Sequence, residues 1–282
     1  MYMIVKVLIE DTANKGYVCE HGFSLYIEYN GKKYLIDSGS TSLFALNAKK
    51  MNVDLSYIDM AFLSHAHYDH SDGFPEFFKH NTNAMVYLQK PSIKQNCYHE
   101  KDSIKKYIGI NKAILKEHKD RFIFVDGYKK VDDGIYIIPH NSKGLLDRAA
   151  LTSMYVLEND EFKYDDFSHE QTVVFEENDS LVCFNSCSHS GVDIVIDEVK
   201  KQFPNKKIKA YFGGFHMMGL DGASSCCYSK EEVVKIAETL KKSCEATFYS
   251  GHCTGTIACD YLGEVLSDRF VVLHSGDNIN VI

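Results

Sequence analysis

The sequence lacks several features that would assign it to a special class of protein. Proline is scarce, with 4 residues among 282, and no low-complexity block is present, which excludes a fibrous or disordered chain. No apolar run approaches the ~20 residues that a membrane-spanning helix needs, and the N-terminus has no charged segment followed by a cleavage site. We therefore expect a cytoplasmic globular protein that does not bind a membrane.

Positive charge is also in deficit, because 31 lysines and arginines stand against 39 aspartates and glutamates and leave a net charge of −8. A nucleic acid would need a basic face, so we expect no nucleic-acid partner.

Tryptophan is absent, while 18 Tyr and 17 Phe supply rings for a core or for stacking on a flat ligand. Nine cysteines, an odd number in a chain of this length, favour reduced thiols over a disulfide framework. The oligomeric state does not follow from composition.

The sequence contains strand patterns first and alternating helix and strand patterns later. Strands are predicted at residues 5–9, 23–29, 33–37, 60–63, 134–138, 154–157, 171–176, 181–185, 207–212, 246–249 and 270–273. Helices are predicted at residues 41–50, 191–203, 229–242 and 256–266. Asn30-Gly31 predicts a hairpin turn, and Ser229 with Glu232 predicts a capping box. This α/β order favours two sheets faced by helices.

The lysine-rich segment 90–135 interrupts this order and has few core signals. We interpret it as a partly helical insertion or cap that could govern substrate selectivity, with a solvated helical hairpin as the alternative. We expect residues 1–282 to form a single domain that carries this insertion.

A cluster of metal-ligand residues follows the apolar strand at 60–63. In 'SHAHYDHSDG', His65, His67, Asp69 and His70 fall within six residues. Side chains of an extended turn repeat with period two, so His65 and His67 project to one side, and Asp69 and His70 can reach a second centre. Imidazole and carboxylate ligands suit zinc, iron or manganese, and two such ions can share one hydroxide.

Further histidines stand where later strands end in turns of small residues. His189 lies in 'NSCSHSG', His216 in 'GGFHMMG' and His252 in 'SGHCTGT'. Because ligands of α/β proteins bind at the carboxyl ends of strands, we expect all three to line the site. His169, in 'SHEQ', is either a further ligand or a neighbour of the ligands, and His21 could face the site.

The other histidines resemble surface or loop residues: His80, His99, His118, His140 and His274. Asp37, which ends strand 33–37, would orient a ligand histidine.

Helices begin just after the turns at His189 and His252, and their first residues are small or carry hydroxyl groups. A helix N-terminus attracts phosphate or carboxylate. This favours an anionic substrate; the residues concerned are Ser188, Ser190, Gly191, Thr254, Gly255 and Thr256.

Taken in order, 'EHGFS', 'YLIDSGS', 'SHAHYDHSDG', 'CSHSG', 'GGFH' and 'GHCTG' resemble the metallo-β-lactamase superfamily, whose signature is H-x-H-x-D-H. More narrowly, they resemble its dihydropterin-synthase-like subgroup, named for 7,8-dihydropterin-6-methyl-4-(β-D-ribofuranosyl)-aminobenzene-5′-phosphate synthase. The resemblance implies a four-layer αββα sandwich with metals at the edge between two sheets. It implies the metal ligands His65, His67, Asp69, His70, His189 and His252. The superfamily's bridging aspartate is missing where 'NSCSH' stands, so Cys187 or His189 replaces it or the second metal is held differently.

We therefore predict a metallo-hydrolase with two divalent metal ions, zinc being favoured and manganese, iron or magnesium being alternatives. A metal-bound hydroxide would attack a small, anionic substrate, phosphorylated or pterin-like. Asp69 would orient the hydroxide and take its proton, and His216 would donate a hydrogen bond to the developing oxyanion. His169 and Thr254 are the predicted substrate contacts.

Three other functions stay open at this point. The subgroup name suggests a synthase or transferase that condenses a dihydropterin diphosphate with an aminobenzene ribotide. The same cluster could hold iron in a redox or oxygen-binding protein, although no flavin domain is visible. A metal sensor without catalytic activity is the fourth candidate.

Overall fold

The computed structural model describes residues 3–140 and 142–281, and its internal contacts divide the chain into two compact units. The first unit comprises Met1–Gln95, Ile108–Asp126 and Leu273–Ile282, and the second comprises Asn96–Tyr107 and Gly127–Val272. Each unit has its own mixed sheet and helices, as the α/β pattern predicts. A single domain over residues 1–282 stays a prediction.

The first unit is built on a seven-stranded sheet in the order β20-β1-β2-β3-β4-β5-β8. Its strands are β1 (Met3–Ile9), β2 (Ser24–Tyr29), β3 (Lys32–Ile36), β4 (Met60–Phe62), β5 (Met85–Gln89), β8 (Phe122–Val125) and β20 (Asn278–Val281), and its helices are α1 (Leu43–Lys50), α2 (Tyr68–Ser71), α3 (Phe74–His80) and α4 (Lys112–Glu117). Asn30 and Gly31 join β2 to β3 with φ of 51° and 76°, as a type I′ hairpin turn requires. Strands β3, β4 and β5 are parallel, so the residues after β3 and β4 meet at one edge.

The second unit contains another seven-stranded sheet, in the order β19-β18-β15-β14-β13-β10-β9. Its strands are β9 (Lys129–Asp132), β10 (Ile135–Pro139), β13 (Gln171–Glu177), β14 (Ser180–Phe184), β15 (Lys207–Phe212), β18 (Thr247–Ser250) and β19 (Phe270–Val272). Strands β14, β15, β18 and β19 run parallel. The loops after β14, β15 and β18 therefore leave from the same edge of the sheet.

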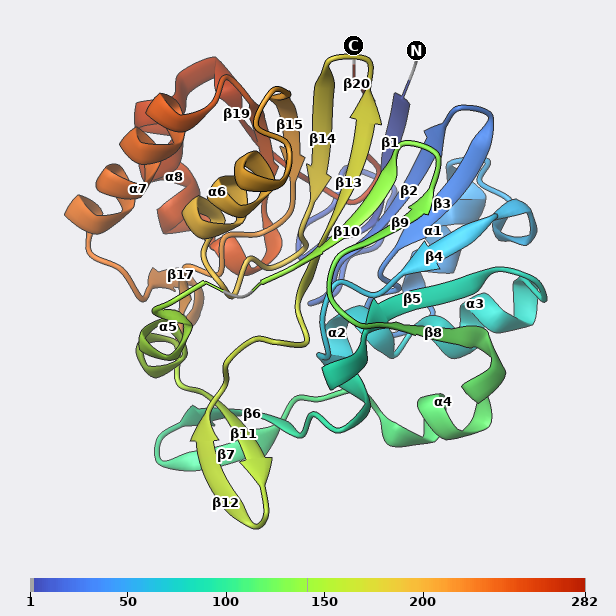
Figure 1. Ribbon diagram of the computed structural model, residues 1–282, viewed down its shortest axis with the longest axis horizontal. Coiled ribbons are helices and arrows are strands. Elements are labelled where there is room, and N and C mark those ends of the chain that lie inside the picture. Colours follow the sequence, from blue (N-terminus) through green and yellow to red (C-terminus); the bar gives the residue numbers. More distant parts are fainter. Residues whose placement is uncertain (1–2, 141, 282) are drawn as a thin grey trace. The chain divides into compact units, whose positions relative to one another are not determined.

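Three helices cover one face of this second sheet: α6 (Val192–Gln202), α7 (Lys230–Ser243) and α8 (Thr256–Leu266) (Figure 1). Their apolar stripes pack on strand residues in a buried core that includes Val195, Val233, Leu262, Tyr211 and Phe248. Burial of that stripe supplies most of the stability of each helix, because propensity alone does not hold a helix of this length.

The predicted strands and helices outside segment 90–135 are confirmed, with bounds that differ by at most two residues. The predicted capping box is present at the start of α7, where Ser229 and Glu232 bond each other's backbone and side chain. The elements outside that segment that sequence patterns did not predict include β5, a short apolar run, and α3, whose three phenylalanines are clustered. Among the described residues, no helix is long and apolar enough to cross a bilayer.

Segment 90–135 differs from the predicted helical insertion in its secondary structure. Helix α4 and the 3₁₀ turns η2 (Lys90–Ile93) and η3 (Lys119–Arg121) are its helical parts. Strands β6 (Cys97–Lys101) and β7 (Ile104–Tyr107) form a hairpin through Asp102 and Ser103, whose φ values are 53° and 61°. The hairpin joins β11 (Met154–Glu158) and β12 (Glu161–Tyr164) in a four-stranded sheet. Few residues of this small sheet are buried, so polar residues such as lysine are tolerated in its strands. The alternation of apolar and polar residues that predicts a strand is therefore weak.

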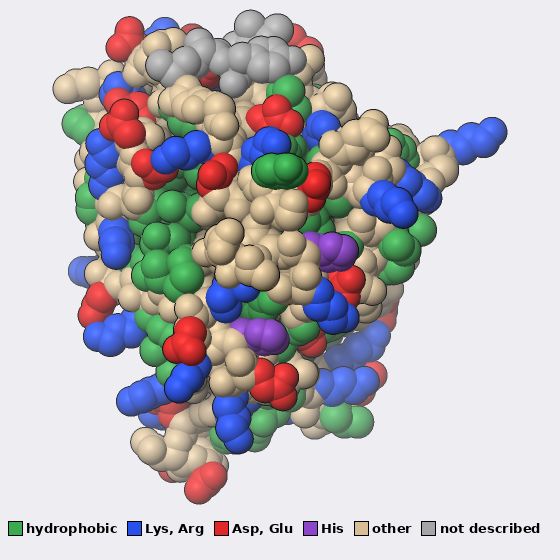
Figure 2. All heavy atoms as spheres, turned by 90° about the vertical axis from the view of Figure 1, so that its right-hand side faces the viewer, with side chains coloured by type: hydrophobic (Ala, Val, Ile, Leu, Met, Phe, Trp, Pro, Cys, Tyr) green, Lys and Arg blue, Asp and Glu red, His purple; other side chains and the backbone are tan. Residues whose placement is uncertain are grey.

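A short helix and a two-stranded hairpin complete the second unit: α5 (Leu145–Leu151), and β16 (Met218–Gly219) with β17 (Gly222–Cys226). Acidic and basic side chains are interspersed with hydrophobic ones over the face shown in Figure 2. That face thus carries charges of both signs.

Candidate functional site

The loop after β4 brings four metal-ligand side chains together in the first unit. His67 is in extended conformation and pairs with Gly109, and the short helix α2 then turns Asp69 and His70 back toward it. The ring of His65 lies 4.5 Å from that of His67 and 4.2 Å from that of His70, measured between centroids. The structure therefore places His65, His67 and His70 together, as the spacing predicts.

Two of these rings are fixed in orientation by hydrogen bonds to Nδ1. Ser64 Oγ lies 2.8 Å from Nδ1 of His65, and Asp37 Oδ2 lies 2.7 Å from Nδ1 of His70. Asp37 also accepts hydrogen bonds from the backbone N–H and the hydroxyl of Ser64, both at 2.7 Å. Because Nδ1 is engaged, Nε2 is the nitrogen of each ring that can ligate a metal. Asp37 thus holds a histidine ring, as expected, and the role of His70 as a metal ligand stays a prediction.

Asp69 lies beside two imidazoles. Its Oδ2 is 3.5 Å from Nε2 of His70 and 3.5 Å from Nε2 of His21, and His21 is held in turn by Asp11 at 2.9 Å. Burial by itself would lower the pKa of His70, but the carboxylates of Asp69 and Asp37 raise it to about 9. His21 thus contacts the cluster, although almost half of its side chain is exposed.

In the second unit, the loops after β14, β15 and β18 carry the predicted residues His189, His216 and His252. Ser188, His216 and His252 have φ of 50°, 49° and 49°, a left-handed conformation that residues other than glycine seldom adopt. Such backbone strain concentrates at functional sites, where the surrounding structure enforces it. All three loops therefore hold side chains that the fold positions at a cost in energy.

The histidines of these loops contact one another and a buried aromatic ring. The centroids of His189 and His216 are 4.0 Å apart, and Phe167 stacks on His189 at 5.2 Å with an angle of 22° between the rings. The Nδ1 atom of His216 is buried and has no hydrogen-bond partner among the described residues. A buried imidazole nitrogen of this kind can form a hydrogen bond with a bound ligand.

Two cysteines join His252 in the second unit. The ligand atoms of Cys187, His252 and Cys253 all lie within 4.8 Å of one another, and all three residues are buried. Burial opposes ionisation of Cys253, but Cys187, His216 and His252 together hold the pKa of its thiol well below the ordinary value. Sequence reasoning included Cys187 as a substitute for the bridging aspartate and missed Cys253, although it follows His252 directly in 'GHCTG'.

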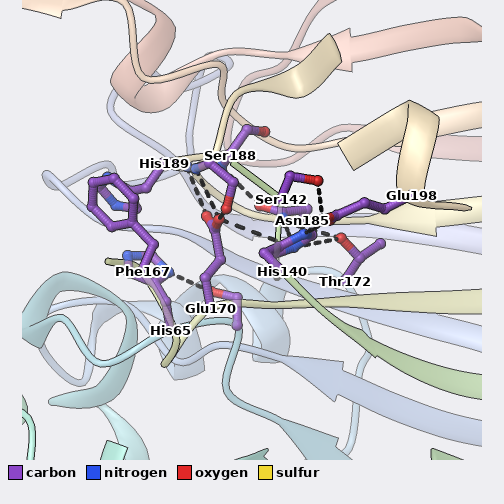
Figure 3. Close-up of polar contacts among 12 residues, drawn as sticks. His65, His140, Ser142, Phe167, Glu170, Thr172, Asn185, Ser188, His189 and Glu198 are labelled. Carbon is purple, nitrogen blue, oxygen red and sulfur yellow. Dashed lines mark hydrogen bonds and ion pairs between the residues drawn. The ribbon is translucent and has the colours of Figure 1, made fainter. Parts of the chain in front are cut away.

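A buried carboxylate holds the turn that carries His189. Glu170 accepts a hydrogen bond from the backbone N–H of His189 at 2.7 Å (Figure 3). It also accepts bonds from the backbone N–H of Ser190, at 3.0 Å, and from the hydroxyl of Ser190. Asn185 accepts a further bond from the N–H of Ser188 at 2.7 Å. The structure thus places a carboxylate of the chain itself against the turn at which we expect an anionic substrate.

His140 lies in the loop after β10, as predicted, but it is not a surface residue. Its ring is buried, with Nδ1 2.5 Å from Glu198 and Nε2 within 3.1 Å of Thr172 and Asn185 (Figure 3). The strand 135–139 ends just before it, and a histidine one residue past a strand gives no sequence signal of burial. Glu170 was not predicted either, because the functional role predicted for this segment was assigned to its neighbour His169.

The two predicted substrate contacts are buried and bonded within the second unit. His169 Nε2 lies 3.0 Å from Asp165 Oδ2 and 3.8 Å from the thiol of Cys97. The Thr254 hydroxyl accepts a bond from the N–H of Phe215 at 2.9 Å and lies 2.8 Å from Ser250 Oγ. Contact of either residue with a substrate stays a prediction.

The donor chemistry fits divalent transition metals. In each unit, imidazole nitrogens meet carboxylate or thiolate donors, and histidine rings whose Nδ1 is held by the protein are typical of metal ligands. Ligands of this kind favour zinc or iron over magnesium.

Comparison with known proteins gives consistent results. A family model described as the anti-Pycsar protein Apyc1 matches residues 21–102, which contain 'SHAHYDH'. The uncharacterised protein MJ0448 of Methanocaldococcus jannaschii is 29% identical over 99% of this chain and 100% of its own length. The 7,8-dihydropterin-6-methyl-4-(β-D-ribofuranosyl)-aminobenzene-5′-phosphate synthase of the same organism is 26% identical over 96% of this chain and 94% of its own.

A solved structure matches the whole fold. Tm1679, a metal-dependent hydrolase of the β-lactamase superfamily, is 25% identical to this chain, covers 98% of both chains and superposes with a TM-score of 0.82. The predicted fold class is thereby confirmed. With its H-x-H-x-D-H cluster the chain has the metallo-β-lactamase fold, and its similarity to the synthase supports the predicted resemblance to the dihydropterin-synthase-like subgroup.

Proposed function

We propose that this protein is a metal-dependent hydrolase that acts on a small, anionic substrate with two divalent metal ions, zinc being favoured. The observation that carries the proposal is the orientation of His65 and His70, whose Nδ1 atoms are held by Ser64 and Asp37. The fold relative described as a metal-dependent hydrolase supports it. A small molecule as the only partner, without nucleic acid, and a cytoplasmic location stay predictions.

In this proposal the ligands are His65, His67, Asp69 and His70 of the first unit and His189 and His252 of the second. When bound, the metals supply Lewis-acid activation of water and of the substrate oxygen. The chain's own task is to hold these side chains in place before substrate arrives, because a ligand that must reorient loses metal affinity.

Two residues are proposed to handle protons and charge. Asp69 would orient the attacking water and accept its proton, since its carboxylate lies 3.5 Å from the imidazoles of His21 and His70. His216 donates a hydrogen bond from its buried Nδ1 to the developing oxyanion. His169 and Thr254 are proposed to contact the substrate.

The test replaces two ligands together, His65→Ala with His67→Ala, and measures bound metal by elemental analysis beside turnover on a panel of small phosphate and carboxylate esters. We expect bound metal to be lost and turnover to fall by more than ~100-fold, because loss of an outer-shell partner alone costs 10–100-fold in metal affinity or activity. His80→Ala is the matched control, since His80 is exposed on α3 and bonds only Glu76 in the contacts described. Unchanged metal content and turnover in the double variant would contradict the proposal.

A second candidate is condensation of a dihydropterin diphosphate with an aminobenzene ribotide. The synthase that is 26% identical over 96% of this chain favours it. The two reactions separate cleanly when diphosphate release is followed with and without the second substrate. Release that requires the aminobenzene compound indicates the synthase, and release in its absence indicates hydrolysis.

An iron redox or oxygen-binding protein is the third candidate, and it predicts a visible absorption spectrum. Purification without chelator, followed by elemental analysis and a spectrum under air, distinguishes it from a colourless zinc enzyme. A metal sensor without turnover would show bound metal and no activity on either assay.

A further inference from the structure

The second unit holds two thiols and an imidazole at one point. The Sγ atoms of Cys187 and Cys253 and a ring nitrogen of His252 lie within 4.8 Å of one another, and each residue is less than 5% exposed. The thiol of Cys253 donates a hydrogen bond to the carbonyl oxygen of Cys187 at 3.7 Å. Neither cysteine is among the ligands of the proposed function, and only Cys187 was considered from the sequence, as one possible replacement for the bridging aspartate.

The topology explains how residues 66 positions apart meet. Cys187 follows β14, and Cys253 follows β18, and both strands pair with the intervening strand β15. Two glycines, Gly213 and Gly214, follow β15, and because they have no side chains they leave space between the two cysteine loops. A Cβ on Gly214 would lie 2.4 Å from Sγ of Cys253, and a Cβ on Gly213 would lie 1.8 Å from the carbonyl oxygen of Asn185. The glycine pair therefore lets the two cysteine loops approach.

Three explanations for such a pair of buried thiols can be compared. Simple apolar packing does not explain why an imidazole is the third member of the group. A disulfide is not formed, because both cysteines are reduced in the structure. A metal ion accounts for all three, since cysteine sulfur and histidine nitrogen are the donors of zinc sites.

We propose that Cys187 and Cys253 ligate, together with His252, one metal ion as thiolates. This inference rests on the proposed function, and it makes the metal centre of the second unit a soft one that prefers zinc, cobalt or iron to magnesium or manganese. Two S–H bonds break and two metal–sulfur bonds form, and both protons pass to solvent. No oxidant or reductant takes part.

Cobalt(II) substitution tests the assignment through a signal that activity does not supply. Thiolate ligands give cobalt a strong near-ultraviolet charge-transfer band, whereas imidazole and carboxylate ligands do not. We expect the band in the full-length protein, about half of its intensity in Cys187→Ser or Cys253→Ser, and its loss in the double variant. Cys259→Ser in α8 is the control and should keep the full band, because its buried thiol is outside the group.

X-ray absorption of the zinc form needs no variant and so does not depend on their folding. Two sulfur scatterers at ~2.3 Å support the proposal, while nitrogen and oxygen scatterers alone, at 2.0–2.1 Å, overturn it. A double cysteine variant that keeps the cobalt band, or a disulfide between Cys187 and Cys253 in metal-loaded protein, also overturns it. In those cases bound metal and turnover would leave the hydrolase proposal intact. A chain that binds no metal ion overturns both proposals.

Discussion

Asp37 shows how one carboxylate can prepare a metal ligand. It accepts three hydrogen bonds, from His70 Nδ1 and from the backbone and hydroxyl of Ser64, and it does so from a left-handed backbone with φ of 57°. An asparagine at this position would keep that backbone, because asparagine tolerates the left-handed region as aspartate does. Its amide, however, can face His70 with a donor and force the tautomer whose Nε2 carries the proton.

We therefore expect Asp37→Asn to weaken metal binding by 10–100-fold while the protein stays folded. Competition with a chromogenic chelator measures the affinity, and circular dichroism checks the fold. Asp54→Asn is the matched control, because Asp54 only caps the 3₁₀ turn η1 (Leu55–Tyr57) through Ser56. Equal affinity in the wild type and Asp37→Asn would show that the hydrogen bond does not prepare His70.

Residues are predictable from sequence where the chain brings them together locally. The spacing of His65, His67 and His70 within one loop predicts their meeting, and the structure confirms it. His140 and Glu198 are 58 residues apart in the sequence and meet only in the folded chain, so no local sequence pattern predicts the pair. Cys187 and Cys253 are the same case, because parallel strands and a glycine pair bring them together.

At the scale of elements, helix α7 offers a separate test of the forces that hold the second unit. Ser229 Oγ accepts a hydrogen bond from the N–H of Glu232, and Glu232 in turn accepts one from the N–H of Ser229. We expect Ser229→Ala to lower the free energy of unfolding by ~1 kcal/mol, because the N–H of Glu232 loses its hydroxyl acceptor. Urea unfolding measures the loss, and metal content should not change.

Thr239→Ala within the same helix is the control. The Thr239 hydroxyl bonds the carbonyl oxygen of Lys235 on an exposed face, and alanine has the higher helix propensity, so stability should hold or rise slightly. A similar loss in both variants would mean that the capping box adds nothing.

Elements follow from sequence where caps and periodicity agree. Helix α7 has both a capping box and an apolar stripe, and its predicted bounds are nearly correct. The hairpin of β6 and β7 has neither signal, since charged and polar residues interrupt its apolar positions and only its turn residues have positive φ. Its small sheet also requires β11 and β12, which lie about fifty residues later in the chain.

At the scale of the whole molecule, metal binding and folding must be linked if the ligands are preorganised by the fold. A metal that binds only the folded chain stabilises it by RT ln(1 + [L]/Kd), which is ~2.7 kcal/mol when the free metal is 100 times Kd. For a chain of this size that corresponds to a rise in Tm of roughly 5 °C or more. The ligand groups of both units contribute, because each is assembled from loops that only the folded sheets hold.

We therefore expect a chelator to lower the Tm of metal-loaded protein by roughly 5 °C or more and added zinc to restore it, as measured by scanning calorimetry. The shift should shrink in the His65→Ala, His67→Ala double variant, because fewer ligands then distinguish the folded from the unfolded chain. Ser229→Ala should lower Tm with and without metal by the same amount, since its cap is remote from the ligands in the chain and leaves the shift intact. Equal Tm with and without metal in the wild type would mean that the ligand groups are not built by the fold, and that the preorganisation inferred from Asp37 and Ser64 has no energetic effect.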